Sequence, residues 1–374
     1  MNILVNCSNL KAGGGLQVAD SICCQLNKIE PHQFIVVLSS FLNKTKAKIS
    51  EYNNVKVFSY DISNSFSSIV LGRDRYLDSL VIEYNVDRVL TVFGPSRWRP
   101  QVPHLSGFAL PQLIFPESPF FQRMRWNERI RWSIWGMVRK WSLSRSADAF
   151  WTENEFVSEK LKSLVNNKEV YTVTNYYNQV FDKPELWNRK ILLPHFDGIT
   201  CLSVSSPTNH KNFGIIEEVI RCFRLYYPGF KVRFVLTFSP NDWPMDREIV
   251  DSLIYLGKIE VSECPNLYMQ SDIMFMPSLL ECFTATYPEA MRMEVPIVTT
   301  DLIFARGLCG DAACYYNSTD GKSAADAIYR VATDKEYARR LVENGKRKLL
   351  EYDNYDDRVN KLINILLKVS RVKT

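Results

Sequence analysis

The sequence predicts an α/β protein with two doubly wound domains, each built around a parallel sheet. Its 374 residues are too many for one domain of typical size and suit two. Short apolar runs that have the character of buried strands alternate with amphipathic stretches, as in parallel sheets with helices on both faces. Hydrophobic residues make up 46% of the chain and charged residues 23%, which is the balance of an ordinary globular protein.

The first domain is expected over residues 1–180. Its strands are predicted from apolar runs at 2–6, 34–38, 55–58, 88–92, 104–110, 147–151 and 169–173. A glycine turn and an amphipathic stretch at 16–26 separate the first two strands. A segment marked by proline and asparagine, 175–194, predicts the linker to the second domain.

The second domain is expected over residues 195–352, with strands at 199–204, 232–237, 273–276 and 297–299. A final helix is predicted over 355–372. It carries one apolar face that must pack against other parts of the protein, formed by Val359, Leu362, Ile363, Leu366 and Leu367.

Composition argues against several classes of protein. Nine cysteines without a C-x-x-C pair and four scattered histidines predict neither a disulfide framework nor a zinc site. No apolar run is long enough for a membrane span, and the first strand is too short for a signal peptide, so we expect a cytoplasmic protein. The net charge of +5 is accompanied by no nucleic-acid-binding motif.

The most informative stretch is 277–296, where Glu281 and Glu289 flank a predicted turn from a strand into a helix. If the helix begins near Thr284, its free N–H groups and positive dipole end form a site for a phosphate group. The two carboxylates would then lie on either side of that anion. The alternative is that Glu281 caps a helix and Glu289 is an ordinary surface residue.

The run Glu281-Cys-Phe-Thr-Ala-Thr-Tyr-Pro-Glu289 resembles the E-x7-E motif of retaining GT-B glycosyltransferases, especially glycosyltransferase family 4. The strand and turn at 295–301 and the Gly-Asp-Ala-Ala run at 310–313 resemble the strand, turn and short loop that come after this motif in the family, in the same order. The Asn-His-Lys-Asn run at 209–212 resembles its phosphate-contacting lysine segment. The resemblance covers nearly the whole chain and is strongest over 200–317.

The resemblance implies a GT-B fold, with two Rossmann-like domains, a cleft between them, and a C-terminal helix, 355–374, that crosses back onto the first domain. It implies catalytic roles for Glu281 on the sugar hydroxyls, Lys211 on the diphosphate and His104 on the donor sugar, although a histidine satisfied in the core would look the same. It also implies a set of donor-binding residues: Glu289 on the ribose, with Phe283, Thr284, Ala285, Gly14 and Gly15.

Two departures from the family pattern qualify this resemblance, and the glycine turn raises NAD binding as a rival. Ser206 stands where the family often has a second cation, for which Arg306 is the candidate replacement. Thr284 stands where the family usually has glycine. The glycine turn before Leu16 fails the G-x-G-x-x-G pattern at Val18, which argues against an NAD-binding site. The alternative to donor binding at this turn is a tight turn with no ligand. Glu117 is a further acidic candidate in a proline-rich loop.

The implied reaction is transfer of a hexose-type sugar from a UDP- or GDP-linked donor, with retention, to a hydroxyl of a glycan acceptor. The family setting suggests a lipid-linked chain of lipopolysaccharide or capsule. Lysine and a helix dipole would neutralise the diphosphate, so no metal or other cofactor is expected. A nucleotide-sugar 2-epimerase of the same fold and a non-catalytic glycan-binding relative remain open alternatives.

A stretch rich in arginine and tryptophan, 123–145, predicts a helix with one apolar face formed by Trp126, Ile130, Ile134, Met137, Val138 and Trp141. We favour packing of this face against the sheet. The alternative is peripheral contact with an anionic membrane at the inner face of the cell membrane, with arginine meeting the lipid headgroups.

Overall fold

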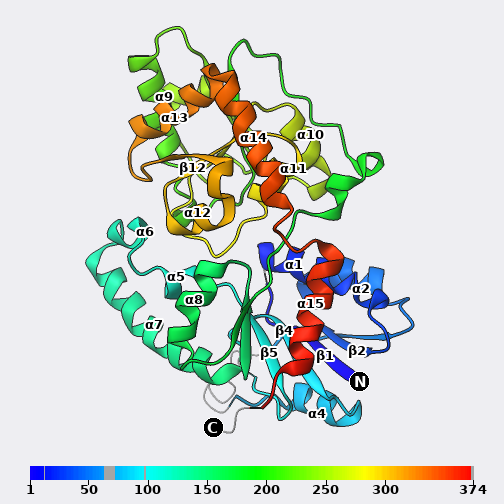
Figure 1. Ribbon diagram of the computed structural model, residues 1–374. Coiled ribbons are helices and arrows are strands. Elements are labelled where there is room, and N and C mark those ends of the chain that lie inside the picture. Colours follow the sequence, from blue (N-terminus) through cyan, green and yellow to red (C-terminus); the bar gives the residue numbers. More distant parts are fainter. Residues whose placement is uncertain (12, 63–71, 97, 372–374) are drawn as a thin grey trace. The chain divides into compact units, whose positions relative to one another are not determined.

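The computed structural model describes residues 1–11, 13–62, 72–96 and 98–371, and the chain forms two compact units. Unit 1 comprises Met1–Pro116, Met124–Asn175 and Asp353–Thr374. Unit 2 comprises Glu117–Arg123 and Tyr176–Tyr352. Each unit contains its own parallel sheet with helices packed on it (Figure 1).

The sheet of unit 1 has seven strands in the order β3-β2-β1-β4-β5-β6-β7, and every recorded pair is parallel. Each strand expected from the apolar runs is present, because strands buried on both faces are continuous hydrophobic segments. The strands are β1 (Asn2–Cys7), β2 (Gln33–Leu38), β3 (Val55–Ser59), β4 (Arg88–Gly94), β5 (His104–Phe108), β6 (Ala149–Thr152) and β7 (Val170–Thr172).

Helices connect these strands, and apolar clusters lie on both faces of the sheet. Asp74 and Asn154 cap α4 and α8 by accepting hydrogen bonds from first-turn N–H groups. The helical elements are α1 (Gly14–Cys23), η1 (Leu26–Lys28), η2 (Ser40–Leu42), α2 (Asn43–Ile49), α4 (Arg75–Glu83), α5 (Pro111–Ile114), α7 (Trp126–Ser146), α8 (Glu155–Leu164) and α15 (Tyr355–Lys368).

The last helix, α15, belongs to unit 1, although the chain passes through unit 2 before reaching it (Figure 1). Val359, Leu362, Ile363 and Leu366 of its predicted apolar face are buried in the main core of unit 1. The buried Arg358 donates to Ser21 Oγ at 2.6 Å and to Asn175 Oδ1, which joins α15 to α1 and to the segment after β7. The helix ends at Lys368, and the predicted extension to 374 reaches residues 372–374, which lie outside the described part of the chain.

The sheet of unit 2 has six strands in the order β10-β9-β8-β11-β12-β13, again with parallel pairing. Two edge strands, β10 and β13, add to the four that the apolar runs predict. The strands are β8 (Ile199–Ser203), β9 (Val232–Leu236), β10 (Leu253–Tyr255), β11 (Ile273–Met276), β12 (Ile297–Thr300) and β13 (Ala313–Tyr316).

Helices α9 and α13 pack closely in unit 2, since a Cβ on Gly321 would lie 2.4 Å from Glu218 Cβ. The segment predicted as a linker packs here as well, with Phe181 fully buried and its ring centroid 6.0 Å from that of Tyr268. The helical elements are α6 (Pro119–Gln122), η3 (Gln179–Asp182), η4 (Pro184–Leu186), η5 (Asn209–Lys211), α9 (Ile215–Tyr226), η6 (Arg247–Ser252), η7 (Val261–Glu263), α10 (Cys264–Met269), α11 (Thr286–Arg292), α12 (Ile303–Cys309), η8 (Gly310–Ala312), α13 (Gly321–Thr333) and α14 (Lys335–Leu349).

Two glycines of unit 1 provide a matched test of this packing. A Cβ on Gly107 in β5 would lie 1.8 Å from Val92 O and 2.8 Å from Trp151 Cε2, whereas a Cβ on Gly136 within α7 meets nothing within 4 Å. We expect Gly107→Ala to lower the free energy of unfolding by on the order of 3 kcal/mol. Gly136→Ala should raise it by about 1 kcal/mol, because alanine is the better helix former. Urea denaturation of both variants measures this, and equal effects would contradict the described packing of β5.

Candidate functional site

The candidate site lies where the strand order of the unit 2 sheet reverses. The chain moves outward from β8 to β9 and β10 on one side, and from β11 to β12 and β13 on the other. β8 and β11 are therefore neighbours whose subsequent loops diverge at the carboxyl edge. In open α/β sheets this point is where ligands bind. The loops in question are 204–214 after β8 and 277–285 after β11.

An ion pair joins these two loops. Lys211 Nζ, at the end of η5, lies 2.5 Å from Glu281 Oε1 in the loop after β11. Both side chains are largely buried, with 13% and 10% of their surface exposed. Ser278 Oγ donates to the same carboxylate oxygen at 2.9 Å. The structure thus brings together two residues that are 70 positions apart and that the sequence singles out separately.

His210 supports the junction of the loops. Its backbone oxygen accepts a hydrogen bond from Leu279 N at 2.8 Å, and its Nε2 lies 3.9 Å from Glu281 Oε1. Burial lowers the pKa of the His210 imidazole, although the charge of Glu281 acts in the opposite direction. A neutral imidazole leaves Lys211 as the cation that balances Glu281 at this place.

Glu289 lies on α11 in a different environment from Glu281. It is 6% exposed, and its recorded hydrogen bond comes from the hydroxyl of Tyr268 on α10, 3.1 Å from Oε2. Burial raises the pKa of the Glu289 carboxyl to about 7, while the hydrogen bond from Tyr268 acts to lower it. The alternative that Glu289 is an ordinary surface residue is therefore wrong. No local sequence pattern indicates Tyr268 as its partner, since the two lie 21 residues apart on separate helices.

The helix after Glu281 begins two residues later than predicted, at Thr286 rather than Thr284. The reason is Pro288, which has no N–H to donate to the carbonyl of Thr284. The first such bond of this helix runs from Glu289 N to Ala285 O at 2.9 Å. The Thr284 hydroxyl instead contacts the Thr286 hydroxyl at 2.8 Å.

Phe283, the remaining predicted donor-binding residue of this loop, has its ring centroid 6.3 Å from that of Tyr352 in an edge-on arrangement. It lies within the same unit as Glu281 and Glu289.

Arg306 is engaged elsewhere in unit 2. Its Nε lies 2.6 Å from Asp301 Oδ1 and its terminal nitrogen 2.9 Å from Oδ2, a bidentate pair on the exposed side of α12. The guanidinium also lies over the ring of Tyr315, 4.1 Å from its centroid. The hydrogen bonds recorded for Arg306 do not link it to the Lys211 and Glu281 pair. With its charge already matched by Asp301, it is a weaker substitute for the cation absent at Ser206.

The remaining predicted site residues lie in unit 1. Gly14 and Gly15 begin α1 directly after β1, and Gly13 before them has the left-handed φ of 72° that glycine adopts freely. A Cβ on Gly14 would meet nothing within 4 Å, so this turn leaves open space beside the backbone.

His104 occupies the amino-terminal end of β5 and is 1% exposed. Its Nε2 lies 2.8 Å from Thr91 Oγ1 and its Nδ1 2.9 Å from Ser146 O, so both ring nitrogens have partners. Burial lowers the pKa of His104 to about 3. Ligands of such sheets bind at the opposite, carboxyl edge. These facts favour the alternative of a core histidine over contact with a donor sugar.

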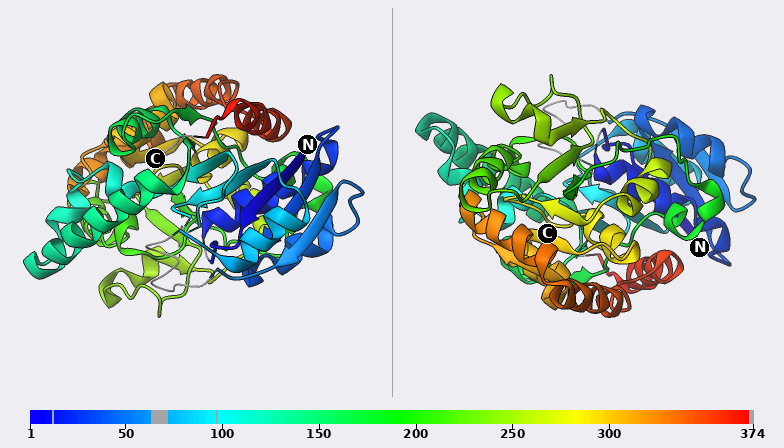
Figure 2. Two further views of the ribbon diagram at one scale, coloured as in Figure 1. Left: turned by 90° about the horizontal axis from the view of Figure 1, so that it is seen from below. Right: turned by 90° about the horizontal axis from the view of Figure 1, so that it is seen from above.

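The arginine- and tryptophan-rich helix corrects another expectation. α7 projects from unit 1 (Figure 2), and its apolar face does not pack against the sheet. Trp126 is 76% exposed and Ile134 54%, and Leu143 and Ser146 are the residues of α7 that are buried. The exposed members of this face, hereafter the α7 face, are Trp126, Ile130, Ile134, Met137, Val138 and Trp141.

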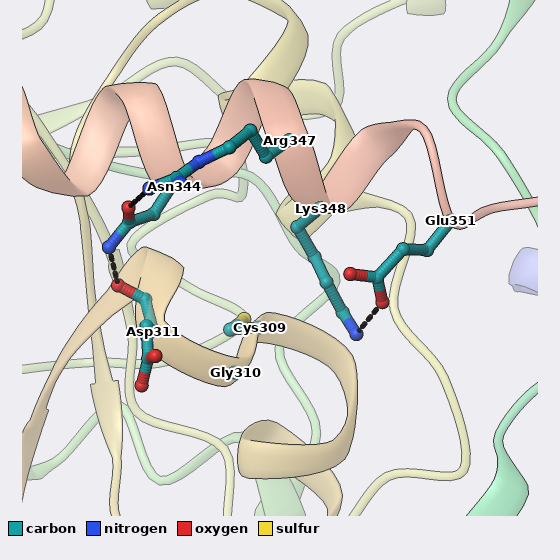
Figure 3. Close-up of a pocket in the computed structure, with 7 residues that line it drawn as sticks. All are labelled: Cys309, Gly310, Asp311, Asn344, Arg347, Lys348 and Glu351. Carbon is teal, nitrogen blue, oxygen red and sulfur yellow. Dashed lines mark hydrogen bonds and ion pairs between the residues drawn. The ribbon is translucent and has the colours of Figure 1, made fainter.

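A hollow of about 380 Å³ elsewhere in unit 2 contains none of the predicted site residues (Figure 3). Its polar lining is bonded internally: Asn344 Nδ2 donates to Asp311 O at 2.8 Å, and Lys348 Nζ lies 2.5 Å from Glu351 Oε2. The full lining is Cys309, Gly310, Asp311, Asn344, Arg347, Lys348 and Glu351.

The described residues offer neither a metal cluster nor a membrane span. No group of three or more His, Cys, Asp or Glu side chains among them is placed to hold a metal ion. Within the same residues, no helix combines the length and the apolar character needed to cross a membrane.

Comparison with known proteins bears most directly on unit 2. Residues 243–348 match the family described as glycosyl transferases group 1. This range contains Glu281, Glu289 and Arg306, and it excludes Lys211 and the predicted residues of unit 1.

One curated relative is the O-antigen chain mannosyltransferase RfbU of Salmonella typhimurium, 24% identical over 135 residues. The aligned part spans 35% of this chain and 37% of that enzyme, little more than a third of each.

Solved structures resemble the whole chain. A glycosyltransferase from Rickettsia africae has a TM-score of 0.69 at 16% identity and covers 99% of both chains. HepE of Anabaena, solved with UDP and glucose, has a TM-score of 0.65 at 13% identity and covers 98% of this chain and 99% of its own. At these identities the likeness defines the fold: the chain has the GT-B fold, with two Rossmann-like α/β domains.

The buried carboxyl of Glu289 predicts a pH dependence of stability. Its pKa rises from an ordinary 4.5 to about 7 on folding, so between these values the folded state binds more protons than the unfolded state. The free energy of unfolding should therefore fall as pH rises through this window. Glu289→Gln should match the wild type near pH 4.5 and be more stable at pH 8, by on the order of 1–3 kcal/mol.

Thermal unfolding at both pH values measures this difference. Glu185→Gln, at an exposed position in η4, is the control and should show no such divergence from the wild type. A constant difference between Glu289→Gln and the wild type across pH would contradict the described burial of Glu289.

Proposed function

We propose that this protein is a retaining glycosyltransferase that transfers a hexose-type sugar from a UDP- or GDP-linked donor to a hydroxyl of a growing, lipid-linked surface polysaccharide. The observation that carries the proposal is the buried Lys211 and Glu281 pair at the switch point of unit 2, within a domain whose later part matches the group 1 glycosyltransferases. The setting in lipopolysaccharide or capsule synthesis is proposed from the resemblance, and the relative named as an O-antigen chain mannosyltransferase supports the first of these.

Lys211 would carry the electrostatic part of the reaction. In transfer from a nucleotide sugar, negative charge develops on the leaving diphosphate as its bond to the anomeric carbon breaks. A preorganised ammonium stabilises that charge more in the transition state than in the ground state, which is what accelerates the chemical step. Its place at the carboxyl edge of β8, held by Glu281, orients the ammonium before the donor binds.

The two glutamates would have different tasks because their partners differ. Glu281, paired with Lys211 and Ser278, would accept hydrogen bonds from hydroxyls of the transferred sugar. Glu289 would accept hydrogen bonds from the ribose diol. Because burial raises its pKa to about 7, binding of a diol that favours the charged form would strengthen as pH rises through neutrality.

The front-face course of a retaining transfer requires no side-chain nucleophile. The leaving phosphate oxygen would take the proton of the acceptor hydroxyl as that hydroxyl bonds to the anomeric carbon on the same face. Gly14 and Gly15 would bind the donor through the backbone of their turn, and a Cβ on Gly14 would meet nothing within 4 Å. The donor-side residues Phe283, Thr284 and Ala285 would line the nucleotide-sugar position next to Glu281. No metal is invoked, since cationic side chains would neutralise the diphosphate.

Removal of Lys211 tests the proposal. Nucleoside diphosphate release should be measured with UDP-, GDP- and dTDP-sugars, first with wild-type protein to find the donor. We expect Lys211→Ala to lower the turnover rate by about a hundredfold or more, because one preorganised contact to developing charge is lost. The control Lys231→Ala removes an exposed lysine that lies 3.5 Å from Asp197, and it should stay within about twofold of wild type.

Loss of Lys211 leaves Glu281 buried without its cation and could reduce stability. The double variant Lys211→Met with Glu281→Gln removes both charges and keeps the volume, so it leaves no unpaired buried charge. Circular dichroism and thermal unfolding show whether it is folded, and a folded double variant without turnover shows that the loss of activity is not a loss of folding. A folded Lys211→Ala protein with wild-type turnover would refute the proposed role. Appearance of an epimerised nucleotide sugar without acceptor would favour the 2-epimerase, and nucleotide-sugar binding without turnover would favour a glycan-binding relative.

We further propose that the protein works at the inner, anionic face of the cell membrane through the α7 face. The six large apolar side chains of this face are exposed, and arginines accompany them on a helix of 21 residues. Arg139 lies over the Trp132 ring at 5.1 Å, and Arg145 over the Trp141 ring at 4.9 Å. Tryptophan at headgroup level with arginine on anionic lipid is the composition of interfacial helices. A lipid-linked acceptor would be reached from that position.

Charge reversal on α7 tests the membrane proposal. Sedimentation with vesicles of phosphatidylglycerol and phosphatidylcholine should fall by about tenfold or more when Arg125, Arg129 and Arg131 become glutamate, since each basic residue contributes about 1 kcal/mol at such a surface. The control reverses Lys335, Arg339 and Arg340 of α14, which are also exposed, and makes the same change in net charge. Equal loss in both triple variants would indicate nonspecific attraction and contradict a role for α7.

A further inference from the structure

A short segment that precedes α7 in the sequence packs onto the loops of the candidate site. Residues Glu117–Arg123 belong to unit 2, although the chain on both sides belongs to unit 1. Ser118 Oγ donates to Leu279 O at 2.6 Å, in the loop after β11. The ring of Phe120 lies edge-on to His210, with centroids 6.4 Å apart. The segment thus contacts both loops that the ion pair of Lys211 and Glu281 joins.

The segment ends with an arginine that contacts the residue after Lys211. A terminal nitrogen of Arg123 donates to Oδ1 of Asn212, the residue immediately after Lys211. Asn212 is 3% exposed, has a left-handed φ of 54°, and donates from Nδ2 to Ser318 O at 3.3 Å. Asn212 is therefore a fixed support that positions the guanidinium at the carboxyl edge of β8.

The guanidinium also acts on the end of a second strand. Tyr316 closes β13, and its buried hydroxyl has no recorded hydrogen bond among the described residues. Burial raises the pKa of Tyr316, and the positive charge of Arg123 opposes that rise. The charge of Arg123 thus also acts at the carboxyl end of β13, the edge strand of the unit 2 sheet.

Arg123 differs from the two other candidate cations of the site in having no acidic partner among the described residues. Lys211 is matched by Glu281, and Arg306 by Asp301. In the described part of the chain no ion pair is recorded for Arg123, whose recorded bond goes to a neutral amide. Arginine has five N–H donors, so four remain for an anion. The charges of Lys211 and Glu281 sum to zero at these loops. Arg123 adds one positive charge, so the site as a whole would attract a diphosphate.

We propose that Arg123 supplies the second positive charge for the diphosphate of the donor, in place of the cation absent at Ser206. This inference rests on the proposed function and deepens it. The planar guanidinium would hold phosphate oxygens in a forked contact, and the Asn212 bond would fix its orientation. Arg123 is separated from Lys211 by 88 residues in the sequence, and it contacts the next residue, Asn212, only because the segment folds onto unit 2.

Calorimetric binding of the nucleoside diphosphate tests this inference. The probes are UDP, GDP and dTDP, each compared with its nucleoside. Arg123→Gln should weaken binding of the preferred nucleoside diphosphate on the order of 10- to 100-fold, the range of one charge-assisted contact. It should change nucleoside binding by less than about twofold. Arg123→Lys, which keeps the charge and loses the fork, should fall between wild type and Arg123→Gln.

Two controls separate charge from anchoring. Arg125→Gln makes the same charge change two residues away and should bind as wild type. Ser118→Ala removes a second anchor of the segment and should also keep its affinity, because the Arg123 bond to Asn212 remains. If Ser118→Ala loses as much affinity as Arg123→Gln, Arg123 acts only by anchoring and the inference fails. The inference also fails if the wild type binds the nucleoside diphosphate and Arg123→Gln binds it equally tightly; the proposed function is then unaffected. If the wild type binds no nucleoside diphosphate, both the proposed function and the inference fail.

Discussion

The buried ion pair between Lys211 and Glu281 is the interaction on which the candidate site depends. It joins the loop after β8 to the loop after β11. These two strands are parallel neighbours in the unit 2 sheet, and after them the chain continues toward opposite edges of the sheet. Neither charge could be held there alone, because an unpaired buried charge destabilises the folded state by several kcal/mol. The pair therefore places a cation at the carboxyl edge without that penalty, and the Ser278 hydroxyl and His210 backbone keep the two loops in register.

The two glutamates of the motif show how environment divides similar residues into different roles. They are eight positions apart, and both are buried, yet one faces an ammonium and the other a phenol. Glu281 has a cationic partner, whereas Glu289 lacks one among the described residues and burial raises its pKa to about 7. Such a carboxyl gains most from a ligand that brings hydroxyl donors, which is the chemistry of a ribose diol.

Much of the fold and part of the site can be predicted from local sequence patterns. The strands are predictable because both faces of a parallel sheet are covered, so each strand is a continuous apolar run. Glu281, Glu289 and Lys211 stand out because their short segments resemble motifs of GT-B glycosyltransferases. The patterns place the start of α11 two residues too early. A helix that began at Thr284 would need a hydrogen bond from the N–H of residue 288 to the Thr284 carbonyl, and Pro288 has no N–H. They also misassign the α7 face, because periodicity shows that a face is apolar but not what covers it.

By itself, the sequence determined the α/β class, the order of the strands along the chain and the residues that carry charge at their ends, since these depend on neighbours within a few positions. The tertiary structure alone decided which charges meet. It pairs Arg306 with Asp301, leaves His104 in the core and brings Arg123 to Asn212. The physical reason is that electrostatic partnership depends on distances between atoms and on exclusion of water, and both arise only when segments far apart in the chain pack together.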